Sequence, residues 1–356
     1  MVRASDVSRF RQVVVSMRAL GPVAHQLREA GIEVHTLGMK AGVPTVGASW
    51  RLVKLLRRSK PDLFLCWMYH ANLLGLLAGK LARVPRVVWG IRCSNMDFSC
   101  QRLMTRRVVK LCASLSKLPD LIIVNSEAGR DVHAEMGYAK EKMVVIPNGI
   151  DTDVFKPDPL ARRRVRQELG VSEDALLIGL IARLHPMKDH ETFFKAARLL
   201  AEKRPEVHFL LAGAEISPKN PELSRMVREY NLDRHGHLLG ARQDVPALTA
   251  ALDIATSSSA FGEGFSNVLG EAMACGVPCV VTDVGDSAAV IGDTGKVVPP
   301  RSPEKLASAW LELIELGRPG RLELGAKARK RIEDRFHLKH VVAQYQTLYE
   351  SLSVKK

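Results

Sequence analysis

The chain has several absences that exclude common functional classes. It contains no stretch of about 18 apolar residues, so the sequence predicts no membrane-spanning helix. Neither the dinucleotide pattern Gly-x-Gly-x-x-Gly nor the Walker phosphate loop follows any predicted strand, which argues against a dehydrogenase and a P-loop kinase. Aromatic residues make up only 5% of the chain and do not interleave with basic ones, so we expect no nucleic-acid partner.

Cysteine usage excludes a further class of protein. The six cysteines form no Cys-x-x-Cys pair and show no zinc-ligand spacing, so we expect no zinc site built on cysteines. Cys275 and Cys279 flank an apolar Gly-Val-Pro turn, and we interpret them as core thiols. Residues Met1 to Asp6 show no apolar core of a signal peptide, and a reducing cytoplasm is the expected compartment.

Positive charge is concentrated in the first part of the chain. Residues 1–150 contain 23 Lys and Arg against 10 Asp and Glu, whereas residues 151–356 contain 29 against 28. Part of this excess lies in residues 101–117, where basic residues alternate with Leu, Met and Val at helical spacing. A basic amphipathic helix suits an anionic membrane surface, so we expect a peripheral position on the inner face of the cell membrane. An ordinary surface helix packed on a sheet is the alternative.

Apolar runs of strand length alternate with segments of helical period in two successive series, which predicts an α/β protein with parallel sheets covered on both faces. The first series has expected strands at Val13–Met17, Val34–Leu37, Leu63–Met68, Val87–Ile91, Leu121–Asn125 and Val144–Pro147. The second has expected strands at Leu176–Ile181, Val207–Ala212, His237–Leu239, Ile254–Ser257 and Val280–Thr282.

A segment dense in turn residues, from Pro147 to Pro159, separates the two series. We therefore divide the chain into a first domain (1–148), a linker (149–160), a second domain (161–335) and a C-terminal helix (336–356) that packs back on the first domain. Two doubly wound domains facing a cleft bind their ligands at the carboxyl ends of the strands.

The most informative segment is residues 261–271, Phe-Gly-Glu-Gly-Phe-Ser-Asn-Val-Leu-Gly-Glu. Glu263 lies in a loop bounded by glycines, and Glu271 lies two turns into the apolar helix that follows. A Gly-rich turn before a helix N-terminus is an anion site, because free backbone N–H groups and the helix dipole point at the ligand. Two carboxylates beside such a site could bind hydroxyls of a phosphate-linked sugar. The alternative is a solvated helix face, but Glu271 is the only charge between Val268 and Thr282.

Arg183 and Lys188 follow the expected strand Leu176–Ile181 and precede a helix. Two cations at a strand end would neutralise a diphosphate and stabilise the charge that develops when the diphosphate leaves. The alternative interpretation is a pair of surface charges beside a turn.

Together these motifs resemble a known family. The set consists of Pro147-Asn148-Gly149 followed by Ile150-Asp151-x3-Phe155, then Arg183-x4-Lys188, then Glu263-Gly264-Phe265 with Glu271-Ala-Met-Ala-Cys-Gly-Val-Pro. This set is similar to glycosyltransferase family 4, a retaining family with the two-domain GT-B fold. The later runs Thr282-Asp-Val-Gly-Asp-Ser and Gly-Asp-Thr-Gly-Lys-Val-Val-Pro-Pro resemble members that build bacterial surface polysaccharides.

The resemblance implies roles for individual residues. Glu263, Arg183 and Lys188 would be the catalytic residues, with the two cations holding the donor diphosphate. Glu271 would hold the ribose hydroxyls of a nucleotide sugar. The backbone of Gly264, Phe265, Ser266 and Asn267, with Glu263, would hold the transferred sugar and the distal phosphate. The family implies no metal and no other cofactor.

The chain departs from the family pattern at two places. Relatives open with a strand and a Gly-Gly loop, whereas Val13–Met17 resembles their second strand, so we expect a first domain that is incomplete at its N-terminus. In Trp89-Gly-Ile-Arg-Cys93, Cys93 stands where relatives commonly carry His. The candidate cleft contacts of the first domain are His70, Arg92, Cys93, Asn148 and Gly149.

The sequence therefore predicts a retaining glycosyltransferase that moves a sugar from a nucleotide-diphosphate donor to a lipid-linked or growing glycan acceptor. One alternative is a truncated, catalytically inactive sugar-nucleotide binder. Another is a nucleotide-sugar epimerase of the same fold, but the first domain offers no convincing acid/base set for it. The donor base and sugar, the linkage and the oligomeric state are not specified by the sequence.

Overall fold

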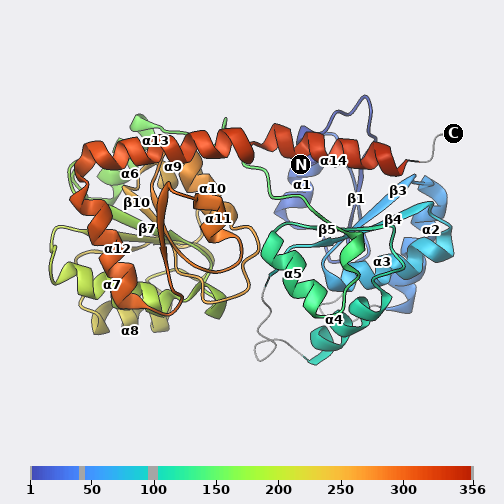
Figure 1. Ribbon diagram of the computed structural model, residues 1–356, viewed down its shortest axis with the longest axis horizontal. Helices are drawn as coiled ribbons and strands as arrows, with labels where there is room; N and C mark the ends of the chain where they lie inside the picture. The colour runs from blue at the N-terminus through green and yellow to red at the C-terminus, as the bar shows by residue number, and fades with distance from the viewer. Residues whose placement is uncertain (1, 40–44, 95–102, 354–356) are drawn as a thin grey trace. The chain divides into compact units, whose positions relative to one another are not determined.

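The computed structural model describes residues 2–39, 45–94 and 103–353. The chain divides into two compact units, one made of residues 1–149 and 338–356 and the other of residues 150–337 (Figure 1). The second unit thus begins within the expected linker, and the C-terminal residues belong to the first unit.

The second unit is built on one continuous parallel sheet of strand order β12-β11-β10-β7-β8-β9. Alternate residues of β7 enter two different core clusters, with Leu177 and Ile181 on one face and Ile178 and Leu180 on the other. A parallel strand that is covered on both faces is buried along its whole length, and all five residues of β7 are buried.

The strands of this unit are β7 (Leu177–Ile181), β8 (His208–Ala212), β9 (Gly236–Leu238), β10 (Ile254–Ser257), β11 (Cys279–Thr282) and β12 (Gly295–Val298). Its α-helices are α6 (Pro159–Leu169), α7 (His190–Ala201), α8 (Pro221–Glu229), α9 (Val245–Ala250), α10 (Asn267–Ala274), α11 (Ser287–Ile291), α12 (Pro303–Glu315) and α13 (Gly317–Arg335).

The first unit has its strands in two separate parallel sheets. One pairs β1 (Val13–Ser16) with β2 (Glu33–Thr36), and the other has the order β3 (Leu63–Trp67), β4 (Arg86–Ile91), β5 (Leu121–Val124) and β6 (Met143–Val145). No described strand joins β1 to β3, and residues 2–12 contain only the short 3-10 helix Val2–Ala4. The expectation that the first domain is incomplete at its N-terminus stays a prediction.

Helices cover both faces of the β3–β6 sheet. The first-unit helices are α1 (Pro22–Glu29), α2 (Val46–Ser59), α3 (Tyr69–Ala82), α4 (Leu103–Leu115), α5 (Glu127–Glu135) and α14 (Leu338–Leu352). Val341 and Tyr345 of α14 pack with Val88 and Ile123 on one face. Gly149 permits this packing, since a Cβ there would lie 2.8 Å from the Cα of Leu338.

Every expected strand segment overlaps an observed strand, so the α/β class with parallel sheets is confirmed. Three elements were not predicted: α6, α11 and β12. Helix α6 has the sequence Pro-Leu-Ala-Arg-Arg-Arg-Val-Arg-Gln-Glu-Leu, in which the arginines obscure the apolar period. Strand β12 is short, lies at the edge of its sheet and carries Lys296, so it has no continuous apolar run.

Candidate functional site

The loops that follow β7 and β10 meet at the carboxyl edge of the second-unit sheet. The two strands are neighbours and run parallel, so their carboxyl ends lie at the same edge. The Ser258 hydroxyl donates to the carbonyl oxygen of Lys188 over 2.8 Å, and the Ala260 N–H donates to that of Met187 over 2.8 Å. The segments holding the predicted Arg183–Lys188 and Glu263 motifs are therefore joined by hydrogen bonds.

Lys188 and Glu263 form an ion pair at this junction. Their side chains are 17% and 9% exposed, and the Ser259 hydroxyl also donates to Glu263 Oε1 over 2.9 Å. Removal of one partner would leave a charge shielded from water and uncompensated. The structure thus brings two of the three predicted catalytic side chains into direct contact.

A third loop supports Glu263, and this loop was not predicted to be part of the site. Gly285 follows β11 at φ +61°, and a Cβ there would lie 2.0 Å from the carbonyl oxygen of Glu263. The Asp286 N–H donates to the carbonyl oxygen of Gly264 over 3.1 Å, and the Thr282 hydroxyl donates to that of Ser259 over 2.7 Å. The glycine within Thr282-Asp-Val-Gly-Asp-Ser could have predicted this loop, because both its backbone angle and its close approach to Glu263 require glycine.

Glu271 lies in the second turn of α10 and is half-buried. Burial raises the pKa of its carboxyl to about 7. No hydrogen bond or ion pair of this carboxylate is recorded among the described residues, so burial is not offset by a protein partner. Hydroxyl groups of a ligand would supply the missing hydrogen bonds.

The residues between the two carboxylates present backbone rather than side chains. Phe265 is buried and packs edge-on against Phe336, with ring centroids 5.2 Å apart. Ser266 occupies the N-cap position of α10 without a side-chain cap hydrogen bond, and Asn267 is exposed. A ligand at this helix end would meet backbone N–H groups, as the sequence analysis expected for Gly264 to Asn267.

Arg183 is exposed, whereas Lys188 is held by its surroundings. Asp189, directly after Lys188, adopts the left-handed conformation at φ +47° and caps α7 by accepting from the Thr192 N–H over 3.1 Å. A non-glycine residue in this conformation is strained, and such strain clusters at functional sites. The turn fixes the position of Lys188 beside Glu263, while the Arg183 side chain retains its freedom to approach a ligand.

In the first unit, Trp67 at the end of β3, Arg92 after β4 and Asn148 after β6 lie together at the carboxyl edge of the sheet. Arg92 donates to Asn148 Oδ1 over 2.5 Å, and its guanidinium carbon lies 4.9 Å from the centre of the Trp67 ring. Burial lowers the pKa of Arg92 from its ordinary value. Trp67 was not predicted as a site residue, because a tryptophan at the end of an apolar strand reads as core.

The remaining first-unit candidates are distributed differently. His70 is half-buried in the first turn of α3, and Cys93 is half-buried after β4. Gly149 has a packing role against α14. Met68, before α3, has a φ of +75° and donates its N–H to the carbonyl oxygen of Gly90, so the turn that carries His70 is strained.

The part of the chain that the structure describes lacks two features, a membrane-spanning helix and a cluster of metal-binding side chains. No helix there is both long enough and apolar enough to cross a bilayer. No group of three or more His, Cys, Asp or Glu side chains there could hold a metal ion.

Comparison with known families and proteins gives consistent matches. The family "Glycosyltransferase Family 4" matches residues 10–154, and "Glycosyl transferases group 1" matches residues 175–316. The chain is 31% identical over 213 residues to the putative glycosyltransferase EpsF of Bacillus subtilis (strain 168), covering 58% of this chain and 53% of that protein.

A second relative is the UDP-Gal:alpha-D-GlcNAc-diphosphoundecaprenol alpha-1,3-galactosyltransferase of Escherichia coli, at 27% identity over 65% of this chain and 60% of that protein. The chain therefore spans between half and two thirds of the length of these curated relatives. Among solved structures, Anabaena Alr3699/HepE in complex with UDP-glucose aligns with a TM-score of 0.84 at 24% identity, over 97% of this chain and 93% of that one.

Proposed function

We propose that the chain transfers a sugar from a nucleotide-diphosphate donor. It has the GT-B fold. It carries a Glycosyltransferase Family 4 domain followed by a Glycosyl transferases group 1 domain. The observation that carries the proposal is the junction of the β7 and β10 loops. The Lys188–Glu263 pair lies in the loops that precede α7 and α10, and the half-buried Glu271 of α10 has no hydrogen bond or ion pair among the described residues. Relatives with known donors use nucleotide sugars.

In the proposed donor complex, Glu271 accepts hydrogen bonds from the ribose hydroxyls. Arg183 and Lys188 bind the diphosphate and stabilise the negative charge that grows on it as the bond to the sugar breaks. Backbone N–H groups at the start of α10 bind the distal phosphate, and Glu263 contacts the transferred sugar. This arrangement assigns charge neutralisation to the two cations and requires no metal or other cofactor.

We propose that transfer retains the configuration of the sugar. The bond between the anomeric carbon and the leaving phosphate oxygen breaks while the acceptor oxygen bonds the same face of that carbon. The leaving diphosphate takes the proton of the acceptor hydroxyl. Retention is supported by the family resemblance, and comparison of the anomeric configuration of donor and product by NMR tests it.

The proposed acceptor is a lipid-linked or growing glycan at the cytoplasmic face of a membrane. The excess of 23 basic over 10 acidic residues in the first 150 positions and the lipid-linked substrate in the name of the E. coli relative support this part. Transfer of labelled sugar into the lipid extract of membranes, and not into water-soluble glycans alone, is the expected result.

A thermal-shift experiment with UDP, GDP, ADP and their sugar conjugates tests the donor site. A ligand that binds only the folded state stabilises it by about 2.7 kcal/mol at a hundredfold excess over Kd. We expect a shift with one base that Glu271→Ala loses and that the control Glu304→Ala, at an exposed glutamate of α12, keeps. A cooperative melt without any nucleotide shift would reject the donor assignment.

Nucleotide binding without transfer is the second candidate function. The division of the first-unit sheet between β1 and β3 favours it, because unpaired strand edges are a defect in the unit that would hold the acceptor. A nucleotide shift combined with no sugar transfer to any membrane extract would select this candidate.

A further inference from the structure

The outer sides of α2, α3 and α4 form an unusual surface in the first unit. These helices contain no Asp or Glu over residues 46–59, 69–82 and 103–115. Their Lys and Arg residues are Arg51, Lys54, Arg57, Arg58, Lys80, Arg106, Arg107 and Lys110. Helices of ordinary soluble surfaces mix both signs of charge.

Helices α3 and α4 lie on one face of the β3–β6 sheet, opposite α14, and α2 packs beside α3 (Figure 1). Helix α3 packs against both α2 and α4. It lies close on the sheet because a Cβ at Gly75 would be 2.1 Å from Cys66 Sγ, and one at Gly79 would be 2.7 Å from Val87. The inner sides of the helices are thus used for the core, and their outer sides face solvent.

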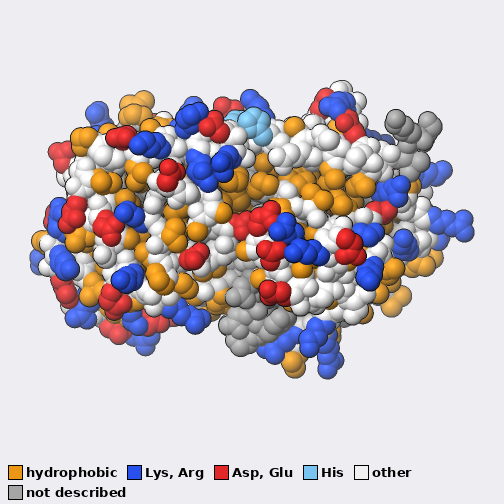
Figure 2. Space-filling view, in the orientation of Figure 1, with side chains coloured by type: hydrophobic (Ala, Val, Ile, Leu, Met, Phe, Trp, Pro, Cys, Tyr) orange, Lys and Arg blue, Asp and Glu red, His pale blue; other side chains and the backbone are white. Residues whose placement is uncertain are grey.

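Large apolar side chains are exposed among these cations. Trp50 is 50% exposed, Leu81 59% and Leu103 71%. Others of this kind on the same helices or directly after them are Val46, Leu77, Met104, Leu111 and Leu118. Figure 2 shows hydrophobic and basic side chains together along the edge where Figure 1 draws α2 and α4. Apolar and basic residues on one surface are the pattern of proteins that lie on anionic bilayers.

Within the part of the chain that the structure describes, no ion pair is found for the cations of α2 and α3 or for Arg107 and Lys110 of α4. In the second unit, by contrast, α7 pairs Lys195 with Glu191 and Arg198 with Glu202. The positive charge of α2 and α3, and that of Arg107 and Lys110, is therefore available to an external anion.

A hollow of about 610 Å³ opens beside this surface, between the C-terminal ends of α2 and α3. Arg57, Lys60 and Arg83 line it with Leu81, and Asp62 is the single acid among its lining residues. Arg57 also approaches Trp50, with its guanidinium carbon 5.7 Å from the ring centre. Carbonyl dipoles at the helix ends and Asp62 oppose an anion here, but three cations outweigh them.

We propose that the outer face of α2, α3 and α4 binds an anionic lipid bilayer, with the exposed Trp50, Leu81 and Leu103 entering the interface and the Arg57–Lys60–Arg83 hollow holding a lipid phosphate. This inference rests on the membrane part of the proposed function and is independent of the donor assignment. The hollow lies where α2 precedes β3 and α3 precedes β4, so it is at the opposite edge of the sheet from Arg92 and Asn148.

Vesicle sedimentation of the full chain tests the face. We expect binding to vesicles of phosphatidylcholine with phosphatidylglycerol, loss of binding at high salt, and no binding to phosphatidylcholine alone. Lys54→Glu/Lys110→Glu should weaken binding at least about 30-fold, because each surface cation contributes substantially to attraction by an anionic leaflet. The control Lys203→Glu/Lys305→Glu makes the same change in net charge at exposed lysines of the second unit and should bind as the parent does.

Two outcomes would overturn the assignment of the face. The parent chain could fail to bind anionic vesicles, or the two double variants could lose binding equally, which would show an effect of net charge alone. Thermal melts of each variant with and without nucleotide show whether it is folded. A chain that binds vesicles but shows no nucleotide shift would reject the donor site and leave this inference standing.

A separate variant tests the hollow. Lys60 and Arg83 both have left-handed backbones, at φ 43° and 58°, so Lys60→Asn/Arg83→Asn removes two charges while keeping residues that tolerate this conformation. We expect about tenfold weaker binding to anionic vesicles. Unchanged affinity would remove the hollow from the proposed surface.

Discussion

Two aspartates occupy the same place in the two units, and their surroundings differ. Asp120 directly precedes β5; its N–H donates to the carbonyl oxygen of Val87 over 2.8 Å, and its carboxylate accepts from the Val87 N–H over 2.8 Å. Asp253 directly precedes β10 and makes the same two bonds with Leu177, over 2.9 Å each. Each carboxylate also binds arginine, so the local motif is repeated.

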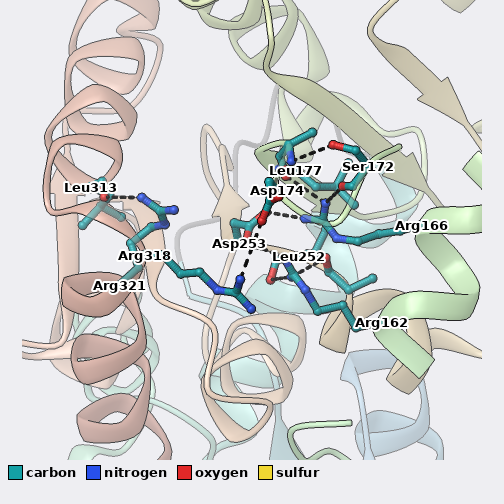
Figure 3. A network of polar contacts seen from close by, with 12 residues as sticks. Arg162, Arg166, Ser172, Asp174, Leu177, Leu252, Asp253, Leu313, Arg318 and Arg321 are labelled. Carbon is teal, nitrogen blue, oxygen red and sulfur yellow. Dashed lines mark hydrogen bonds and ion pairs between the residues drawn. The ribbon is translucent and has the colours of Figure 1, made fainter. Parts of the chain in front are cut away.

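Burial distinguishes the two aspartates. Arg86 and Asp120 are 41% and 22% exposed, whereas Arg166 and Asp253 are 1% and 13% exposed. Asp253 also binds Arg162 over 2.8 Å (Figure 3), and Arg166 donates to the carbonyl oxygens of Ser172 and Ala175. The same two hydrogen bonds therefore lie at a solvent-exposed site in the first unit and within a buried network of charged side chains in the second.

The largest expected effect comes from breaking the buried network. Asp253→Ala leaves the Arg166 guanidinium buried without its carboxylate, which costs about 3–5 kcal/mol of unfolding free energy. Hydrogen exchange read by mass spectrometry should show faster exchange in β7 and β10 and unchanged exchange in β4. Equal acceleration in both units would show that the network does not act on the second unit alone.

The next largest effect is on the pH dependence of stability, and it is expected from the burial of Glu271 in the second unit. Its pKa of about 7 lies above the ordinary value, so the folded state retains a proton that the unfolded state has lost. This contribution to stability is complete below about pH 4.5 and disappears as the pH rises through 7. Glu271→Gln stays neutral, so its stability relative to the parent should rise by on the order of 2 kcal/mol between pH 5 and 8. Denaturant titrations at both pH values, with Glu304→Gln as control, measure the difference, and a constant difference would contradict it.

A smaller effect is expected from the solvated aspartate. Asp120→Ala removes the bond to the Val87 N–H and the Arg86 pair, but water can replace both, so the cost should be about 1–2 kcal/mol. Exchange should accelerate in β4 and β5 only. A cost equal to that of Asp253→Ala would mean that burial does not decide the difference between the two motifs.

The smallest expected effect is on the stability of the second unit at acidic pH. Burial, followed by the neighbouring His208 and His235, lowers the pKa of His237 to about 4. The folded state keeps this ring neutral, so its contribution to stability is present above about pH 6.5 and is lost as the pH falls toward 4. His237→Gln should flatten the fall in second-unit stability between pH 7 and 5 by about 1 kcal/mol. Hydrogen exchange of β8 and β9 at both pH values measures it, and an unchanged slope would contradict the assignment.

The sequence by itself determined the class of fold and the segments that form the proposed donor site. Alternation of apolar runs identified strands from Val13 onward, because strands covered on both faces must be apolar along their length. Lys188 and Glu263 were predicted from loops that follow strands, and Glu271 from an apolar helix; the family resemblance implied their roles, and the structure joins Lys188 to Glu263. Elements with few apolar residues, such as α6 and β12, were missed for the same physical reason.

Only the tertiary structure decided which residues cooperate across the sequence. Ser259, Thr282 and Gly285 support Glu263 through contacts between loops of neighbouring strands, and no local pattern encodes strand order. The sequence showed a basic helix at residues 101–117, but the surface it shares with α2 and α3 exists only because α3 and α4 pack on one face of a sheet and α2 packs beside α3. Burial, which sets the pKa of Glu271 and separates Asp120 from Asp253, is likewise a property of the assembled fold.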